Sequence, residues 1–443
     1  MGMSIKVAMI SLGCPKNQVE AEHMLALLAD AGCELVGDAS EAQVAVVNTC
    51  GFIDSAKQEA IDSILEMAAL KQQGLCGIVV TGCLAERYRQ QIRQQMPEVD
   101  VVLGGGSVGD IVEAVQQAAQ GKSFERYADI EKAPLGGDRL LTTPFYTAYL
   151  KLGDGCDNFC TYCAIPLIRG RLRSRPLEEL VQEAQALAQS GVRELVLVAQ
   201  DTTRYGEDLY GENRFCDLLR ELERVEGIVW IRILYAYPDR ISDELLELMA
   251  KSEKILPYID LPLQHANDTI LSAMNRRGSR ADIEAVLAKI RKTLPHACVR
   301  TTFICGFPGE TPEQFEQLCD FVAQQRFERM GCFAYSAEEG TPAADFPNQV
   351  DEAEKQRRTE LLMTLQNTIS TQLNQEMVGK TLPVLVEEYD EELGRYAGRS
   401  YRDAPEVDGR VYFTSEQTHE EGCFVDVTVT AADDYDLYGK AAE

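Results

Sequence analysis

Positive charge is scarce in this sequence, and it has no long apolar run. Lysine and arginine together number 43 against 71 aspartates and glutamates, so the 443 residues carry a formal charge of −28. This balance argues against nucleic-acid phosphates as the main partner, because lysine and arginine normally supply that affinity, although a local basic patch is not excluded. No run of about 18 apolar residues is present, which excludes a transmembrane helix.

Residues Met1–Lys6 also lack the apolar core of a signal peptide, so we expect a cytoplasmic protein. Fourteen cysteines in that compartment serve more often as metal ligands, redox groups or core residues than as disulfides. Hydrophobic residues make up 45% and charged residues 26%, the balance of an ordinary globular protein. The length predicts about two to four domains.

Strands and helices alternate in the first predicted domain, residues 5–121. Short β-branched runs predict strands at 7–12, 43–48 and 77–81, and helical patterns follow at 18–31, 55–71 and 85–95. Such alternation is typical of a parallel sheet with helices on both faces, with ligand sites at the carboxyl ends of its strands. The stretch 121–144 contains Pro134 and the pair Gly136-Gly137, and it is predicted to be a linker.

The alternation resumes with a longer period in the second predicted domain, residues 142–374. Strands are predicted at 148–152, 194–199, 229–235, 258–263, 299–304 and 330–335. Six such units indicate a partial, open (β/α)6 version of the TIM barrel, again with function at the carboxyl ends of the strands. Residues 351–375 are predicted to form one long amphipathic helix.

The third predicted domain, residues 376–442, has the pattern of a small all-β barrel or sandwich. Its strand candidates are 382–387, 394–401, 410–413 and 424–429. The 68 residues from 376 to the end hold 6 basic and 17 acidic side chains, a charge of −11. The chain as a whole is therefore predicted to be an α/β protein with a small β domain at its end.

The most specific motif directly follows the first strand of the predicted barrel. Cys156, Cys160 and Cys163, hereafter the barrel trio, are spaced C-x3-C-x2-C in a loop that contains glycine. Three thiolates hold three irons of a [4Fe–4S] cluster and leave the fourth iron open to a substrate-like ligand. A structural zinc would want a fourth ligand, and no Cys or His lies nearby in the sequence. Three inert thiols are the alternative interpretation.

A second set of cysteines follows the three predicted strands of the first domain. Cys14, Cys50 and Cys83, hereafter the N-terminal trio, each lie at the end of one strand and beside a glycine. The carboxyl ends of parallel strands meet at one edge of a sheet, so we expect these thiols to converge on a second [4Fe–4S] cluster. The alternative is three small buried hydrophobic residues. The other cysteines are interpreted as core residues: Cys33, Cys76, Cys216, Cys298, Cys305, Cys319, Cys332 and Cys423.

Around the barrel trio the sequence resembles the radical S-adenosylmethionine enzymes, whose signature is C-x3-C-x2-C with an aromatic residue, here Tyr162, before the last cysteine. The resemblance implies that the open iron binds the amino and carboxylate groups of S-adenosylmethionine. One electron, from a donor such as flavodoxin or ferredoxin, then cleaves the sulfonium to a 5′-deoxyadenosyl radical. Tyr162 and the strand-end residues Gln200, Gly306 and Pro308 are expected to bind this cofactor. A helix cap is the competing role for Gln200, and an ordinary turn for the segment that contains Gly306 and Pro308.

Over essentially the whole chain the sequence resembles the methylthiotransferases, and within them the ribosomal protein uS12 aspartate methylthiotransferases of the RimO family. The stretches that carry this resemblance are Ser11–Asn17, Asn48–Ile53, Ala199–Gly206, Tyr237–Asp239 and Leu261–His265. The resemblance implies insertion of a methylthio group at the β-carbon of an aspartate of uS12. The barrel trio would ligate the cluster that generates the radical, and the N-terminal trio the cluster that holds or supplies sulfur.

The resemblance also implies that the third domain is a TRAM domain, which in tRNA-acting relatives is expected to be basic. A charge of −11 suits a basic ribosomal protein and repels tRNA, so a tRNA adenosine methylthiotransferase is the less favoured alternative. The alternative of another class is an iron–sulfur electron carrier, which has no use for a vacant iron position. No membrane partner is expected.

Four weaker signals are open to two interpretations each. The four arginines of Arg169–Arg175 are expected to bind an anionic group or ribosomal RNA. The alternative is a basic loop exposed to solvent. Gln200-Asp201 contacts the cofactor ribose or caps a helix. His265 faces the site or, more often for such a residue, is a satisfied barrel histidine. Glu338 and Glu339 are expected to be solvated turn carboxylates.

Overall fold

A six-stranded parallel sheet forms the first part of the computed structural model, which describes residues 4–442. The strand order is β2-β1-β3-β4-β5-β6. The strands are β1 (Lys6–Ser11), β2 (Glu34–Val36), β3 (Val44–Thr49), β4 (Gly77–Gly82), β5 (Val101–Leu103) and β6 (Phe124–Arg126). The helices are α1 (Pro15–Asp30), α2 (Asp54–Leu70), α3 (Cys83–Arg87), α4 (Arg89–Gln95) and α5 (Ile111–Ala119). The N-terminal segment without a predicted signal peptide includes Met1–Met3, which lie outside the described residues.

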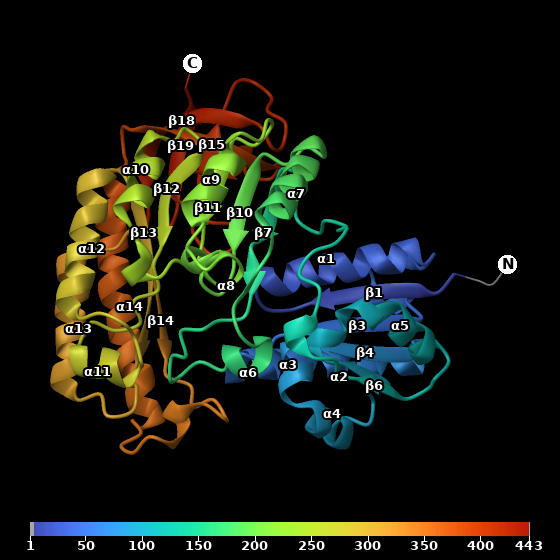
Figure 1. Cartoon of the computed structure of the whole chain (residues 1–443). Helices are drawn as coiled ribbons and strands as arrows, with labels where there is room; N and C mark the ends of the chain where they lie inside the picture. Colours follow the sequence, from blue (N-terminus) through green and yellow to red (C-terminus); the bar gives the residue numbers. More distant parts are fainter. Residues whose placement is uncertain (1–3, 443) are drawn as a thin grey trace.

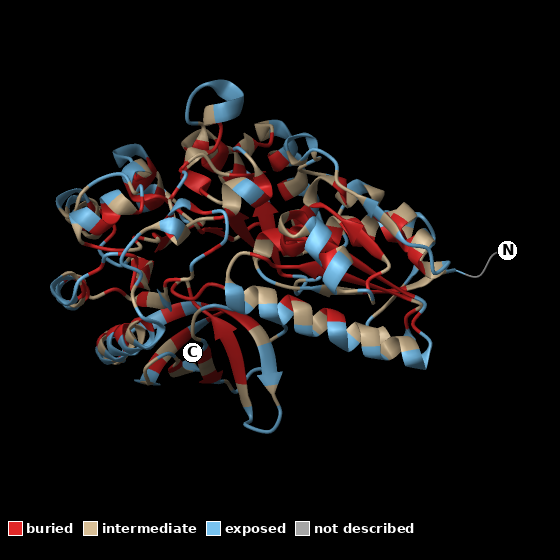
Figure 2. Ribbon diagram, turned by 90° about the horizontal axis from the view of Figure 1, so that it is seen from below, coloured by how far each residue is buried: buried red, intermediate tan, exposed pale blue. Residues whose placement is uncertain are grey.

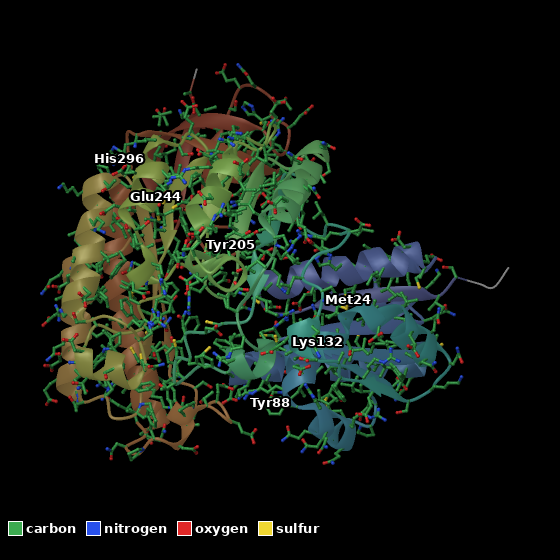
Figure 3. All side chains as sticks on the ribbon, viewed as in Figure 1. Met24, Tyr88, Lys132, Tyr205, Glu244 and His296 are labelled. Atoms are coloured by element: carbon green, nitrogen blue, oxygen red, sulfur yellow. The ribbon has the colours of Figure 1, made fainter. Side chains whose placement is uncertain are left out.

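Apolar side chains cover both faces of this sheet. Helices α1 and α5 pack on one face, where Met24, labelled in Figure 3, meets strand residues such as Val46. Helices α2, α3 and α4 pack on the other face, for example through Ile64 against Val47. Figure 2 shows the strands as largely buried and the helices as exposed on one side. The predicted parallel sheet with helices on both faces is confirmed.

Two local predictions in this domain are wrong, and three short strands were not predicted. The helix expected at 85–95 begins at Cys83 and is interrupted at Tyr88, whose backbone leaves the helical region (φ −120°, ψ 35°). The predicted linker 121–144 contains β6, which pairs with β5. The strands β2, β5 and β6 each span only three residues, too few to give a periodic signal in the sequence.

The central part of the chain forms a second, open sheet in the order β14-β13-β12-β11-β10-β7. Its strands are β7 (Thr147–Lys151), β10 (Glu194–Val198), β11 (Trp230–Ile233), β12 (Ile255–Asp260), β13 (Cys298–Cys305) and β14 (Arg329–Ala334). Each overlaps one of the six predicted strands, and all neighbouring pairs are parallel. The partial (β/α)6 barrel is confirmed.

Helices and short elements complete this barrel. The helices are α6 (Ile165–Arg169), α7 (Leu177–Gln189), α8 (Glu207–Tyr210), α9 (Phe215–Glu223), α10 (Asp243–Lys251), α11 (Asp268–Ala273), α12 (Arg280–Thr293), α13 (Pro312–Gln325) and α14 (Glu352–Gln375). Two short strands, β8 (Gly153–Asp154) and β9 (Arg173–Ser174), pair with each other beside β7. Within residues 4–442, no helix combines the length and the apolar character needed to cross a bilayer.

The last part of the chain is a closed five-stranded barrel in the order β15-β16-β17-β19-β18. Its strands are β15 (Thr381–Asp390), β16 (Arg395–Arg399), β17 (Val411–Thr414), β18 (Phe424–Ala432) and β19 (Leu437–Ala441). The sequence analysis did not predict strand β19, and it did not decide between a barrel and a sandwich. In Figure 1 this barrel, in red, packs against one end of the central barrel, and the blue N-terminal domain lies beside the other end.

The junction between the two barrels lies at the amino ends of the central strands. Trp230 begins β11, and its ring meets Phe424 of β18 edge to face, with centroids 4.7 Å apart. Glu194 begins β10, is fully buried and pairs with Arg232 of the central barrel (2.8 Å) and Arg399 of the small barrel (2.6 Å). Burial raises the pKa of Glu194, but the two arginines outweigh it and lower the pKa to about 2.

We predict that Glu194→Gln destabilises this junction by about 3 kcal/mol, because it leaves two buried guanidinium groups without their shared carboxylate. Urea unfolding followed by the fluorescence of Trp230, the only tryptophan of the chain, measures the loss directly. A lowered carboxyl pKa stabilises the folded state above the ordinary value of 4.5 and loses this effect as the pH falls toward 2. The wild-type transition should therefore lose more stability than the variant over that pH interval.

A matched control is Glu247→Gln, which removes an exposed pair with Lys251, whose side chain is 76% exposed. This change should cost less than about 0.5 kcal/mol. Equal effects of the two substitutions would contradict the structural role given to Glu194.

Candidate active site at the interface of two domains

The N-terminal trio lies at the carboxyl edge of the first sheet. Cys14 precedes α1 in the loop after β1, Cys50 directly follows β3, and Cys83 opens α3 after β4. These three strands are neighbours in the sheet, and Ser11 pairs with Asn48 and Thr49 with Gly82, so the strands end within one residue of each other. Cys50 and Cys83 are buried, and Cys14 is half-buried. The three cysteines lie at one edge of the sheet, as expected, and their convergence on an iron cluster stays a prediction.

Two glycines allow the loops of this trio to approach one another. Gly13 has φ +92°, and a Cβ atom there would lie 2.7 Å from Cβ of Cys50. Gly82 has φ +90°, and a Cβ atom there would lie 2.5 Å from the carbonyl oxygen of Thr49. Both the backbone conformation and the space therefore require glycine.

The barrel trio occupies a tight loop between β8 and α6. The N–H of Cys163 donates to the carbonyl of Cys160 at 3.0 Å, and Phe159 adopts a left-handed backbone (φ +50°). Cys160 is buried, with its Sγ 3.6 Å from the phenol oxygen of Tyr237, which follows β11. The trio thus lies over the carboxyl ends of the barrel strands, at the opposite end from the small barrel.

The two trios face each other across the domain interface. Cys83 of the N-terminal trio packs in one buried group with Ala164 and Ile168 of the barrel domain. Ala164 is the residue after Cys163, so the loops of both trios are in contact. Nothing in the spacing of either motif alone predicted this contact.

A buried arginine connects the N-terminal trio to the barrel domain. The guanidinium of Arg169 donates to Sγ of Cys83 at 3.2 Å and to the amide oxygen of Asn17. The same group pairs with Glu20 of α1 and with Asp154, at 3.3 Å, which lies two residues before the barrel trio begins. Arg169 is 3% exposed, so these contacts replace water.

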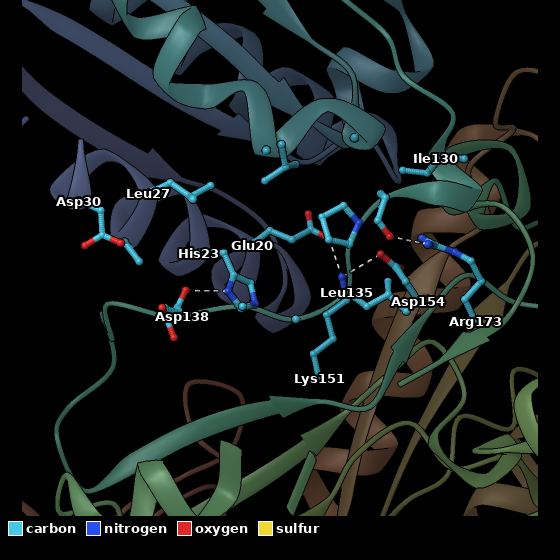
Figure 4. Close-up of a pocket in the computed structure, with 18 residues that line it drawn as sticks. Glu20, His23, Leu27, Asp30, Ile130, Leu135, Asp138, Lys151, Asp154 and Arg173 are labelled. Carbon is cyan, nitrogen blue, oxygen red and sulfur yellow. Dashed lines mark hydrogen bonds and ion pairs between the residues drawn. The ribbon is translucent and has the colours of Figure 1, made fainter. Parts of the chain in front are cut away.

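Lys151 completes this network from strand β7. Its ammonium lies 2.6 Å from Glu20 and 2.8 Å from Asp154. Burial raises the pKa of Asp154, but Lys151 and Arg169 outweigh this effect and hold it far below its ordinary value. Figure 4 shows Glu20, Lys151 and Asp154 converging beside a cavity of about 250 Å³ between α1, the linker and the barrel.

Sequence reasoning missed most of this network. Glu20, Lys151 and Asp154 stand in helix and strand patterns that a surface or strand residue fits equally well. Arg169 belongs to the arginine-rich stretch, which is not a solvated loop throughout. Arg169 and Arg175 are buried, whereas Arg171 is exposed.

The environment of the thiols suits metal coordination. Burial raises the pKa of Cys83 to about 12 and that of Cys156 to about 11, and it raises the pKa of Cys163 further. Neighbouring thiols raise these pKa values again, because one thiolate disfavours another. A coordinated metal removes such protons outright.

The donor set fits iron–sulfur clusters better than a single ion. Each trio offers thiols alone, the ligands that such clusters take. Within residues 4–442, no three His, Cys, Asp or Glu side chains are placed to hold one metal ion. A cluster makes a different demand, because each thiolate binds a different iron.

Two of the residues predicted to bind the cofactor, Tyr162 and Gln200, lie in or beside the loop of the barrel trio. Tyr162 is half-buried and packs against the group that contains Phe307, in the turn after β13. Gln200 donates to Asp154 at 2.8 Å, while its buried Oε1 has no partner among the described residues 4–442. A buried oxygen without a partner is costly, so this atom is available to a ligand that donates a hydrogen bond. Cofactor binding by these residues stays a prediction.

Contacts within the protein explain why the turn after β13 contains glycine. Gly306 has φ +74°, and a Cβ atom there would lie 2.2 Å from Cγ of Lys355 on α14. Its N–H donates to Glu310 at 2.7 Å, and Pro308 is buried in the same turn. The packing of Lys355 is therefore sufficient to require glycine, and approach of a nucleoside stays a prediction.

Two of the weaker expectations meet different outcomes. Glu338 is not a solvated turn carboxylate, because it is 2% exposed and pairs with Arg87 (2.6 Å) and Lys57 (3.0 Å) of the first domain. Only Glu339 is exposed as expected. His265 is fully buried, and its Nδ1 accepts from the N–H of Asn267 at 3.0 Å. Its Nε2 lies 3.8 Å from Glu310 and makes no hydrogen bond within residues 4–442.

The burial of the remaining cysteines agrees in part with the prediction. Cys298 and Cys305 are buried, as expected of core residues. Cys76 is exposed, so its assignment to the core is wrong. The others are half-buried: Cys33, Cys216, Cys319, Cys332 and Cys423.

Three family descriptions match successive parts of the chain. Residues 6–104 match the uncharacterized protein family UPF0004, residues 150–322 the radical SAM superfamily, and residues 378–442 the TRAM domain. Among solved structures, the radical S-adenosylmethionine methyltransferase TsrM from Kitasatospora setae has a TM-score of 0.54 at 15% identity. That match covers 74% of this chain and 73% of TsrM, and it shows a shared fold.

Curated relatives match the chain along its whole length. The ribosomal protein uS12 methylthiotransferase RimO of Desulforamulus reducens is 48% identical over 99% of both chains. The protein of the same name from Clostridioides difficile is 47% identical over 98% of both chains. This chain therefore belongs to the RimO family of radical S-adenosylmethionine methylthiotransferases.

Proposed function

We propose that this protein is a radical S-adenosylmethionine methylthiotransferase that adds a methylthio group to the β-carbon of an aspartate of ribosomal protein uS12. One observation carries the proposal: two trios of thiols, from two domains, face each other across a buried interface in a chain of the RimO family. A saturated carbon beside a carboxylate resists polar chemistry, so the reaction requires a radical and a sulfur source at one place. The arrangement supplies a position for each.

The chain uses S-adenosylmethionine and [4Fe–4S] clusters. We assign Cys156, Cys160 and Cys163 to the cluster that supplies one-electron cleavage of S-adenosylmethionine. The N-terminal trio is assigned to the cluster that carries sulfur. Beside the second trio, the buried guanidinium of Arg169 donates to Sγ of Cys83 at 3.2 Å.

The proposed division of labour follows the predicted domains. Residues 5–121 hold the second cluster, residues 142–374 cleave S-adenosylmethionine, and residues 376–442 form the TRAM domain. An electron donor such as flavodoxin or ferredoxin reduces the barrel cluster, and the protein acts in the cytoplasm. The lack of basic charge supports a protein substrate over tRNA.

The TRAM domain is proposed to attract uS12 from a distance. Its barrel lies at the amino ends of the central strands, away from both trios, so it does not contribute to the reaction itself. Its charge of −11 favours approach of a basic protein and disfavours nucleic acid. A tRNA adenosine methylthiotransferase is the alternative with the same chemistry, and an electron carrier is the alternative without it.

Substitutions in the two trios are expected to abolish different products of the reaction. Anaerobically reconstituted Cys14→Ala should lose the mass gain on uS12 yet still release 5′-deoxyadenosine, because the barrel trio is intact. Cys160→Ala should lose both products. Iron analysis should find about eight irons per wild-type chain and about four in each variant. The readouts are product mass, 5′-deoxyadenosine and iron content.

Cys76→Ala is the matched control, because Cys76 is an exposed thiol of the same domain as Cys14. It should behave as wild type in all three measurements. Full methylthiolation by Cys14→Ala would contradict the two-cluster assignment. Reduced wild-type protein that releases no 5′-deoxyadenosine from S-adenosylmethionine would favour the electron carrier.

Charge reversal on the TRAM surface should weaken binding of uS12. Glu391 and Glu392 are exposed in the turn between β15 and β16. The double variant Glu391→Lys/Glu392→Lys should bind uS12 about two- to fivefold more weakly at low salt, and the difference should vanish at about 1 M salt. Binding titrations at two salt concentrations measure the effect, with tRNA as the competing ligand. Tight tRNA binding with a steep salt slope would instead support the nucleic-acid alternative.

A further inference from the structure

Lys16 is a buried cation that reaches from the first domain into the mouth of the barrel. It lies two residues after Cys14, near the start of α1, and is 7% exposed. Its ammonium lies 3.5 Å from the carbonyl oxygen of Ala199, at the end of β10. It also lies 3.6 Å from the ring centre of Tyr235, after β11. The charge is therefore held at the carboxyl ends of two barrel strands.

This cation lacks the partner that other buried cations have. Every buried lysine and arginine within residues 4–442 pairs with a carboxylate except Lys16 and Arg402. Arg402 lies by Cys298, at the amino end of β13, remote from the trios. Burial lowers the pKa of Lys16, but nearby groups that include Cys14 and Asp154 outweigh burial and raise it. No carboxylate within residues 4–442 pairs with its ammonium directly. Burying an ammonium without such a partner is costly, so the site suits an anion that arrives with a ligand.

The position of Lys16 is between the two trios. On one side it is near Cys14 along the chain. On the other side, Tyr235 under its ammonium and Tyr237 beside Cys160 belong to the same short segment after β11. A substrate group bound by Lys16 thus lies beside both proposed reaction partners.

We propose that Lys16 binds the side-chain carboxylate of the substrate aspartate and thereby selects aspartate at the modified position. This inference rests on the proposed function. The β-carbon is bonded directly to the carboxylate carbon, so a cation that holds the carboxylate also places the β-carbon between the trios. Lysine suits this task, because its charge is compact and its stem is flexible. The ring of Tyr235 and the carbonyl of Ala199 hold the ammonium in place until substrate arrives.

The test compares two peptides on the anaerobically reconstituted holoenzyme. One is a uS12 peptide that contains the aspartate shown by mass spectrometry to be modified, and the other has asparagine at that position. Fluorescence anisotropy of labelled peptides gives both affinities. Wild-type protein should prefer the aspartate peptide by at least about tenfold, the effect of one hydrogen bond to a charged group.

Three variants separate recognition from a merely structural role. Lys16→Met should bind both peptides equally, so that the aspartate preference is lost, and Lys16→Arg should keep part of the preference. Lys132→Met is the control, because the side chain of Lys132 is 83% exposed, and it should keep the full preference. Circular dichroism and iron content establish that the variants are folded and loaded.

Two results would overturn the inference. One is a wild-type protein that binds both peptides equally, which decides the matter even where Lys16→Met fails to fold. The other is a Lys16→Met protein that binds both peptides more weakly but keeps the aspartate preference, as a structural role of Lys16 would require. The proposed function fails separately, through a wild-type enzyme that never adds a methylthio group to uS12.

Discussion

The buried charge network around Arg169 is the interaction on which the site depends. Arg169 contacts Cys83 and Glu20 of the first domain and pairs with Asp154 of its own domain, two residues before the barrel trio. Buried ion pairs of this kind add little net stability but are costly to break singly, since one lost partner leaves a charge in an apolar interior. The network therefore specifies one docking of the two domains and excludes sliding.

Neither domain forms the candidate site without the other. In the first domain three neighbouring parallel strands place their thiols at one sheet edge, because loops at the carboxyl ends of such strands converge, whereas in the barrel one loop after β8 carries all three. Where the two edges meet lie Cys83, the unpartnered oxygen of Gln200 and the ammonium of Lys16. The small barrel lies at the other end of the central strands.

The candidate site was only partly predictable. The six cysteines were visible because a thiol at a strand end is rare and their spacing is specific. Glu338 was misread because a turn rich in small and acidic residues normally lies in water, and nothing local shows that Arg87 arrives from another domain. Arg169 was ambiguous for the same reason, since its carboxylate partners lie 15 and 149 residues away. Gly306 is explained by Lys355 on α14, a contact that no turn motif contains.

The sequence by itself determined those features of the fold that depend on neighbouring residues along the chain. Periodicity placed the six barrel strands and the long helix α14, and the alternation of strand and helix determined the parallel sheets. Periodicity did not reveal the strands of three residues or the helix break at Tyr88, because so few residues show no repeating pattern of apolar side chains. The tertiary structure alone decided which buried charges are paired, because an ion pair across a domain interface depends on docking in space. That is why Lys16 stands out as unpaired only in the folded protein.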